Sequence, residues 1–301
     1  MKTYILPFLM LFTPNIAPAL EVVPVSDGVY AIVGETEQRT KDNLANNATF
    51  GVIVTQDGVV LVDPGGSYLG AAAIDAEIDG VTDLPVKYVI NTGGQDHRWL
   101  GNGYWQDKGA TVIASTAAVA DQKDRASTQL SALSIFLGDQ LAKTEPRYAD
   151  VTFDTDYTLE FGGMTFDIRH RGQAHTPGDS FVWLENSGTV FTGDIVYVER
   201  LLGVGPQSHS GTWIDVLGEV FSLSPQMVVP GHGHPTSPAR AQSESLDYLV
   251  NLRTKMGTLI EEGGDIYDAV KIDQSAFSEL KQFDALAGKN AQAVYQEMEW
   301  E

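Results

Sequence analysis

The chain contains no cysteine among its 301 residues. Without cysteine it has no disulfide framework, no thiolate ligand for a metal and no cysteine nucleophile. Any metal must therefore be bound by His, Asp and Glu, a ligand set that suits zinc, iron or manganese. Histidine is itself scarce, with six in the whole chain.

Positive charge is also scarce. Lys and Arg number 19 against 40 Asp and Glu, which gives a formal charge of −21 at pH 7. A nucleic-acid partner would require basic stripes rather than an acidic surface, so the composition argues against one. The balance bears on solubility and on the medium in which the protein works, and it says little about the fold.

Long apolar runs are absent beyond the amino-terminal segment. That segment has one Lys at position 2, an apolar run interrupted by Pro7 and Pro14, and the sequence Ala17-Pro18-Ala19. This layout is typical of a secretory signal peptide cleaved after Ala19, and the run is too short to span a bilayer. We therefore expect a signal peptide at 1–19, no membrane span in the mature protein and a periplasmic or secreted location.

Short strands and helices alternate through both halves of the remaining chain. Valine, isoleucine and leucine runs bounded by turn residues predict strands, and apolar residues at helical spacing predict helices. The expected strands are 28–34, a hairpin over 50–66, 86–90, 111–115, 157–161, 164–171, a hairpin over 180–194 and 226–232. The expected helices are 67–79, a helical pair over 115–143, 211–221, 238–262, 265–271 and 277–299. The pattern predicts one α/β (α+β) domain at 20–301, with two sheets packed face to face and helices outside.

Three histidines and two aspartates follow predicted strands in loops marked by glycine. They are Asp96, His97, His175, Asp194 and His232. Glycine lets such loops turn sharply, and polar groups at strand ends are how these scaffolds assemble sites. A single histidine in a loop is more often a surface residue, and an isolated aspartate is often a turn residue. The joint pattern of four such loops in a chain without cysteine favours a metal site.

The other three histidines lack such neighbours. His209 stands alone. His170 and His234 are candidates only for side chains that contact a metal-binding residue without binding the metal themselves. Four further residues adjoin the motif loops and are candidates for substrate contact, with packing or a surface salt bridge as equal alternatives: Arg98, Trp99, Tyr197 and Arg200.

The ordered motifs resemble those of the metallo-β-lactamase superfamily. The chain has "NTGGQDH" at 91–97, "AHTPGDS" around His175, "FTGDIVY" around Asp194 and "PGHG" around His232. In addition, "VDPGG" resembles the early structural turn of the family, with Asp63 as the match. The longer strings also resemble exported proteins described as quinoprotein-relay zinc metallohydrolases. The resemblance implies a four-layer αβ/βα sandwich over the whole mature chain.

The first motif departs from the family pattern T-H-x-H-x-D-H. Aligned by its ends, "NTGGQDH" is one residue shorter, and Gly93, Gly94 and Gln95 stand where the family has both histidines. The resemblance implies that those histidines and His175 would bind one zinc ion. The second ion would be bound by Asp96, His97 and His232, and Asp194 would bridge the two.

Zinc in a catalytic site takes about three protein ligands and keeps one position open. Asp96, His97, Asp194 and His232 suffice for one ion, whereas His175 and a shared Asp194 do not hold a second. We therefore predict one Zn²⁺ per chain, with iron or manganese as alternatives. Asp96 and His175 are the predicted catalytic residues, His175 as a general base.

Two classes of function follow. The first is an exported hydrolase that uses metal-activated water on an ester, thioester or lactam bond of a small molecule. The second is a binding or accessory protein of a periplasmic system, built on a partly degenerate site. The missing histidines favour the second class, but five retained candidate ligands favour the enzyme. A redox role with iron is a third possibility.

Overall fold

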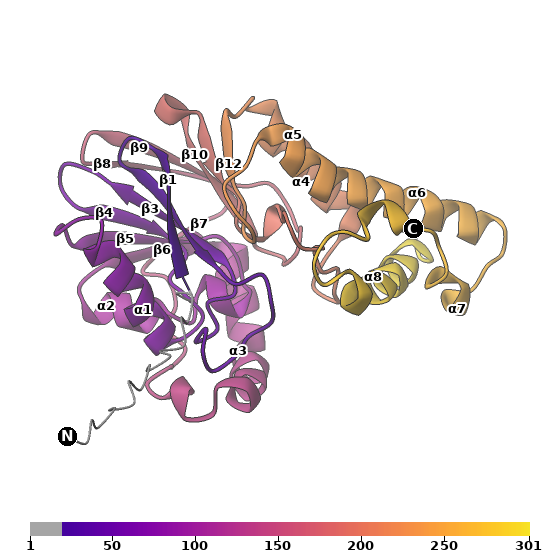
Figure 1. Ribbon diagram of the computed structural model, residues 1–301, viewed down its shortest axis with the longest axis horizontal. Helices are drawn as coiled ribbons and strands as arrows, with labels where there is room; N and C mark the ends of the chain where they lie inside the picture. The colour runs from indigo at the N-terminus through magenta and orange to yellow at the C-terminus, as the bar shows by residue number, and fades with distance from the viewer. Residues whose placement is uncertain (1–19) are drawn as a thin grey trace, which may run out of the picture.

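The computed structural model describes residues 20–301, and within this range the strands form two sheets (Figure 1). The first sheet has seven strands in sequence order, from β1 to β7. Their bounds are Leu20–Ser26 (β1), Val29–Gly34 (β2), Thr49–Val54 (β3), Val59–Val62 (β4), Val86–Asn91 (β5), Thr111–Ser115 (β6) and Val151–Phe153 (β7). The expected hairpin over 50–66 is confirmed, because β3 and β4 pair antiparallel.

The second sheet has five strands in the order β12-β11-β10-β9-β8. Their bounds are Asp156–Phe161 (β8), Met164–His170 (β9), Ser180–Leu184 (β10), Thr189–Phe191 (β11) and Met227–Val229 (β12). The expected hairpin at 180–194 is confirmed, since β10 and β11 pair antiparallel. Gly188 ends its turn at φ 61°, a left-handed conformation that glycine adopts without steric cost.

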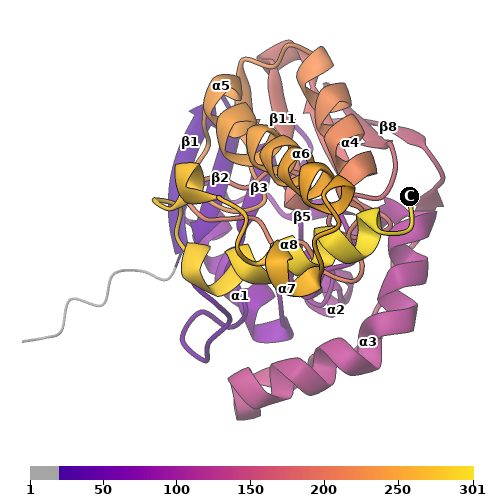
Figure 2. The ribbon, with the colours of Figure 1, turned by 90° about the vertical axis from the view of Figure 1, so that its right-hand side faces the viewer.

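Helices cover the outer face of each sheet. Beside the first sheet lie α1 (Tyr68–Asp79), α2 (Asn102–Asp107) and α3 (Thr116–Leu137). Beside the second lie α4 (Ser210–Ser222), α5 (Pro238–Ala241), α6 (Asp247–Glu261), α7 (Ile266–Ala269) and α8 (Phe283–Met298). Figure 2 looks onto α6 and α8, which project outward from the sandwich. The predicted αβ/βα architecture with four layers is confirmed.

Alternation along the strands builds the layers. Phe50 and Val52 of β3 pack with α1 and α2, whereas Ile53 faces the second sheet. In β10, Val182 lies between the sheets and Trp183 packs with α4 on the outside. Successive side chains of a strand point to opposite faces, so these largely apolar strands bury both faces. Each such side chain contributes about 1.5–3 kcal/mol through burial.

The carboxyl ends of the central strands meet at one edge of the sandwich. Strands β4, β5 and β6 run parallel to one another, and β11 runs parallel to β12. Asp63 follows β4, the 92–98 loop follows β5, Asp194 follows β11 and His232 follows β12. The topology therefore gathers residues far apart in the sequence at this edge, where sheet proteins place their sites.

Two helix predictions were wrong. The helical pair over 115–143 is a single helix, α3, followed by a 3₁₀ turn at Gly138–Leu141. The last helix begins at Phe283 rather than at residue 277, because Gln282 has a left-handed φ of 64° that interrupts any helix. Apolar residues of the 277–299 segment do pack on the core: Val294 is buried, and Leu280, Phe283, Leu286 and Met298 are partly buried there.

The expectations about membranes and export have different outcomes. Between residues 20 and 301, no helix combines the length and apolarity needed to cross a bilayer. The expected signal peptide at 1–19 lies outside the described residues, so it stays a prediction, as does the periplasmic or secreted location.

Candidate metal centre

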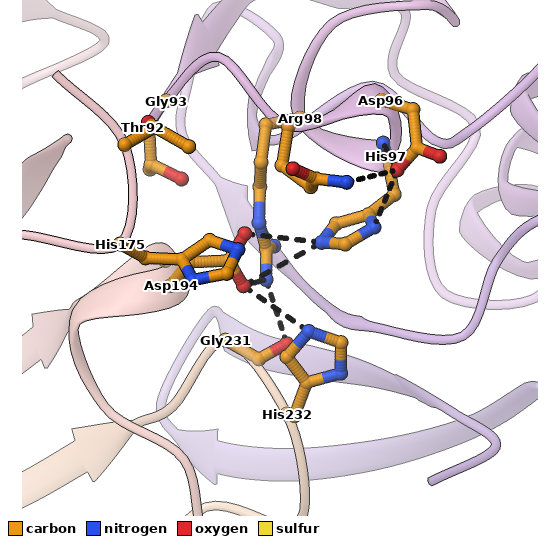
Figure 3. A network of polar contacts seen from close by, with 12 residues as sticks. Thr92, Gly93, Asp96, His97, Arg98, His175, Asp194, Gly231 and His232 are labelled. Carbon is orange, nitrogen blue, oxygen red and sulfur yellow. Dashed lines mark hydrogen bonds and ion pairs between the residues drawn. The ribbon is translucent and has the colours of Figure 1, made fainter. Parts of the chain in front are cut away.

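Three of the predicted ligands meet where the strand ends converge: His97, Asp194 and His232 (Figure 3). Each offers one ligand atom, and the three atoms lie within 4.8 Å of one another. His97 Nε2 is 3.2 Å from Asp194 Oδ2, and His232 Nε2 is 3.1 Å from Asp194 Oδ1. All three side chains are almost fully buried.

The protonation states of Asp194 and His232 suit a divalent ion. Burial tends to raise the pKa of Asp194, but Arg98 and His97 outweigh it and hold the pKa well below its usual range. Burial lowers the pKa of His232 well below its usual range, so its imidazole is neutral. An ionised carboxylate and neutral imidazoles are the forms that bind metals, and three protein ligands leave a position open, so the residues fit one zinc-like ion.

Asp96 lies beside the group and contacts His97. Its Oδ1 lies 3.0 Å from His97 Nδ1, and it accepts a hydrogen bond from the His97 backbone N–H at 2.8 Å. Arg39 Nη2, which can only donate, lies 3.2 Å from the same Nδ1, so this nitrogen faces a carboxylate and a guanidinium together, and Nε2 faces Asp194. Carboxylates commonly hold metal-binding imidazoles in this way.

A guanidinium also engages the Asp96 carboxylate. Arg39, in the segment between β2 and β3, donates to both carboxylate oxygens, with Nε 2.6 Å from Oδ2. Burial tends to raise the pKa of Asp96, but Arg39 and His97 have the larger effect and hold the pKa below its usual range. The structure thus places Asp96 in a bidentate ion pair beside the three-residue group, and its predicted role as a metal ligand and catalytic residue stays a prediction.

Arg98 ties the group to both sheets. Its Nη1 donates to Asp63 Oδ2 at 2.8 Å, and its Nη2 donates to Asp194 Oδ1 at 2.8 Å. It also donates to the carbonyls of Thr49 and Gly231. The side chain is completely buried, so Arg98 makes buried ion pairs within the fold and no surface salt bridge. Trp99 is likewise fully buried in the core.

His175 faces the group from the loop after β9. Its Nδ1 lies 2.9 Å from the Gly203 carbonyl, which can only accept, so Nδ1 carries the hydrogen and Nε2 keeps a free lone pair. Burial lowers the pKa of His175, which keeps the ring neutral. His97, His175 and His232 all line one cavity of about 200 Å³. The arrangement places a neutral imidazole beside the candidate metal group.

Comparison with known proteins identifies the family. The model of the "Metallo-beta-lactamase superfamily" matches residues 45–232, which is more than half of the chain. The chain belongs to the metallo-β-lactamase superfamily. A metallo-β-lactamase from Pontibacter korlensis has 22% identity and a TM-score of 0.62, with 77% of this chain and 99% of that chain covered. DIM-1 metallo-β-lactamase, exposed to ceftazidime, has 20% identity and a TM-score of 0.60, with 77% and 97% covered. At these identities the likeness shows the fold.

At Gly93 and Gly94, where the family motif has histidines, other side chains of this protein occupy the space that a larger residue would need. A Cβ on Gly93 would collide with Asp179 Oδ1, and a Cβ on Gly94 would collide with Asp121 Oδ2. Asp121 is held by Arg125, whose Nε donates to Oδ1 at 2.7 Å. Asp179 accepts from the Thr176 backbone at 2.7 Å, and burial raises its pKa to about 8. The room for the two family histidines has therefore closed.

We expect Gly94→His not to create a second metal site in this superfamily member. The new side chain must displace Asp121 from its pair with Arg125, and such overpacking costs about 1–3 kcal/mol. Metal content per chain and urea unfolding are the measurements. Gly218→Ala is the control, because nothing lies within 4 Å of its Cβ. Two metals per chain with unchanged stability would contradict this expectation.

Sequence reasoning missed several residues around the site. Arg39 lies in a polar segment with no motif, and Asp121 and Arg125 lie on α3 at i, i+4 spacing, a common pattern on any helix surface. Asp179 stands within the quoted string "AHTPGDS", but only its burial distinguishes it. None of these residues carried a pattern in the sequence that separates them from surface charges.

Proposed function

We propose that the protein is a metal-dependent hydrolase with a single divalent ion, zinc by preference, bound by His97, Asp194 and His232. The observation that carries the proposal is the juxtaposition of this buried group with the free Nε2 of His175 in one cavity. Membership of a superfamily whose solved relatives include metallo-β-lactamases adds support. The substrate bond is an ester, thioester or lactam, and the protein is exported.

The chain's own residues divide the work. When bound, the ion supplies Lewis acidity toward a carbonyl and acidifies a neighbouring water. His175 accepts a proton at Nε2, because the Gly203 carbonyl fixes its tautomer. Asp96 holds the orientation of the His97 ring, and the burial of the group excludes bulk water.

The test combines metal content with turnover. Protein purified without added metal is measured by mass spectrometry, then assayed with 4-nitrophenyl acetate, a thioester and a chromogenic lactam, before and after chelation. We expect about one metal per chain and chelator-sensitive turnover of at least one substrate. His175→Ala is expected to keep the metal and lose about 10²-fold in kcat, the usual contribution of a general base.

His234→Ala is the control, because His234 pairs with Glu199 and Glu21 at the surface and does not line the cavity. If the protein binds no metal, or binds one and hydrolyses none of the substrates, the proposed hydrolase function is wrong. The second result would favour the accessory or binding role instead.

A further inference from the structure

The loop that holds His175 has no regular structure of its own, because residues 201–209 form neither helix nor strand. Within it the Gly203 carbonyl accepts from His175 Nδ1 at 2.9 Å, and Ser208 Oγ donates to the His175 carbonyl at 3.0 Å. No described atom beyond its chain neighbours lies within 4 Å of the place of a Gly203 Cβ, so packing does not hold the loop on that side. A carbonyl in such a loop orients an imidazole only if something else fixes the backbone.

Asn290 of α8 holds the backbone on both sides of Gly203. The Val204 N–H donates to Asn290 Oδ1 at 2.8 Å, and Asn290 Nδ2 donates to the Leu202 carbonyl at 2.8 Å. The residue is 1% exposed. A backbone N–H can only donate and a carbonyl can only accept, so the side-chain amide has one orientation here. One buried side chain thus fixes the two peptides that flank the partner of His175.

The Asn290 amide is itself anchored away from the loop. Its Nδ2 also donates to the Tyr248 hydroxyl of α6 at 2.9 Å, and that hydroxyl donates to Gln274 Oε1 at 2.8 Å. Gln274 Nε2 donates in turn to the Ala287 carbonyl of α8 at 3.0 Å. Tyr248 and Gln274 are both buried. Satisfied polar networks in a core are rigid, so Asn290 presents its two loop contacts from a fixed position.

The support for this loop comes from a part of the chain beyond the family match. Helix α8 lies outside the matched residues 45–232. Just before α8, the Lys281 carbonyl accepts from the Leu201 N–H at 2.8 Å, and the Lys281 N–H donates to the Glu199 carbonyl at 2.9 Å. The segment from Lys281 to Asn290 therefore holds the loop at two successive places, and Asn290 is the contact next to Gly203.

We propose that Asn290 is a positioning residue for His175. It holds 202–204 so that the Gly203 carbonyl keeps the hydrogen on His175 Nδ1 and leaves the Nε2 lone pair free to accept a proton. The inference rests on the proposed function only in taking His175 as the base. The tautomer of the ring can be measured without any turnover.

The first test reads the tautomer directly, by ¹⁵N NMR of the full chain labelled at histidine. The His175 signals are assigned by their absence in His175→Ala. We expect hydrogen on Nδ1 in the unaltered protein and a mixture of both tautomers in Asn290→Leu, because the loop loses both side-chain contacts. Metal content is expected to stay unchanged, since Asn290 is not part of the metal group. An unchanged tautomer in folded Asn290→Leu would overturn the proposal.

Gln274→Met is the matched control, because it removes another buried amide of the same network. The Gln274 side chain bonds to the Tyr248 hydroxyl and the Ala287 carbonyl rather than to the loop. Both variants are expected to lower the melting temperature, and only Asn290→Leu to change the tautomer. Equal tautomer changes would show a general loosening of α8 and would count against a positioning role.

A second variant serves if Asn290→Leu does not fold. Asn290→Asp keeps an acceptor for the Val204 N–H and loses the donor to the Leu202 carbonyl. We expect a partial change of the His175 tautomer in this variant. The tautomer of the unaltered protein, retained in Asn290→Asp, would refute the role of the Leu202 contact and with it the proposal.

Turnover then connects the position of the ring to catalysis. With a substrate that the protein hydrolyses, Asn290→Leu is expected to lower kcat about tenfold or more at unchanged KM, because the base is misplaced and the binding surface is not. Gln274→Met is expected to keep kcat near that of the unaltered protein. A changed tautomer with unchanged kcat would overturn the proposal. If no substrate is hydrolysed, the proposed hydrolase fails, and the NMR result still decides whether Asn290 positions His175.

Discussion

Replacing Arg98 by Met is expected to lower the free energy of unfolding by about 3–5 kcal/mol, the cost of breaking a buried ion pair by removing one partner. Arg98 is fully buried, and its guanidinium is the cation that pairs with both Asp63 and Asp194. Methionine keeps much of the length but offers no donor. Two buried carboxylates would then lose their counter-charge, and the Thr49 and Gly231 carbonyls would lose a hydrogen bond each.

Urea unfolding followed by circular dichroism measures this loss. Arg147→Met serves as the matched control, because Arg147 is about half exposed and its ion pair with Asp107 spans 3.4 Å at the surface. Such pairs contribute about 0–1 kcal/mol. A loss below about 1 kcal/mol in Arg98→Met would show that Arg98 does not hold the two sheets together at this edge.

His232→Ala is expected to abolish metal binding, from about one ion per chain to essentially none. His232 provides one of the three buried ligand atoms, and two remaining ligands do not make a stable site for zinc. Metal content is measured by mass spectrometry after dialysis. His234→Ala is a closely matched control, two residues away in the same loop but paired with Glu199 and Glu21. Retention of the metal in His232→Ala would refute the proposed centre.

Asp96→Ala distinguishes the structural assignment from the one made on sequence. If Asp96 is a ligand, as the family motif implies, its removal abolishes binding as His232→Ala does. If Asp96 instead orients His97 and pairs with Arg39, as its contacts indicate, the affinity falls about 10–100-fold, the usual effect of an outer partner, and the metal is retained at saturation. We expect the second result, measured by zinc titration against a competing chelator.

The sequence by itself determined the layers and the edge at which the site lies. Apolar runs such as 59–62 identify buried strands because a strand covered on both faces has no polar positions. Glycine and turn residues then mark where those strands end, and three of the ligand candidates, His97, Asp194 and His232, are brought together there. Local patterns carry this information because burial and turn geometry constrain residues near in sequence.

Only the tertiary structure decided how the charges are paired. Arg39 reaches Asp96 across 57 residues, and Arg98 reaches Asp194 across 96. The sequence left Arg200 a candidate for substrate contact, packing or a surface salt bridge, and only the structure shows that its Nε and Nη1 are buried without a hydrogen-bond partner within residues 20–301. Pairing between charges depends on distance in space, and a chain whose strands cross over between two sheets gives no local pattern for it. The sequence shows directly that the two family histidines are missing. It does not show that Asp121 and Asp179 occupy their space, because that proximity arises only in the folded chain.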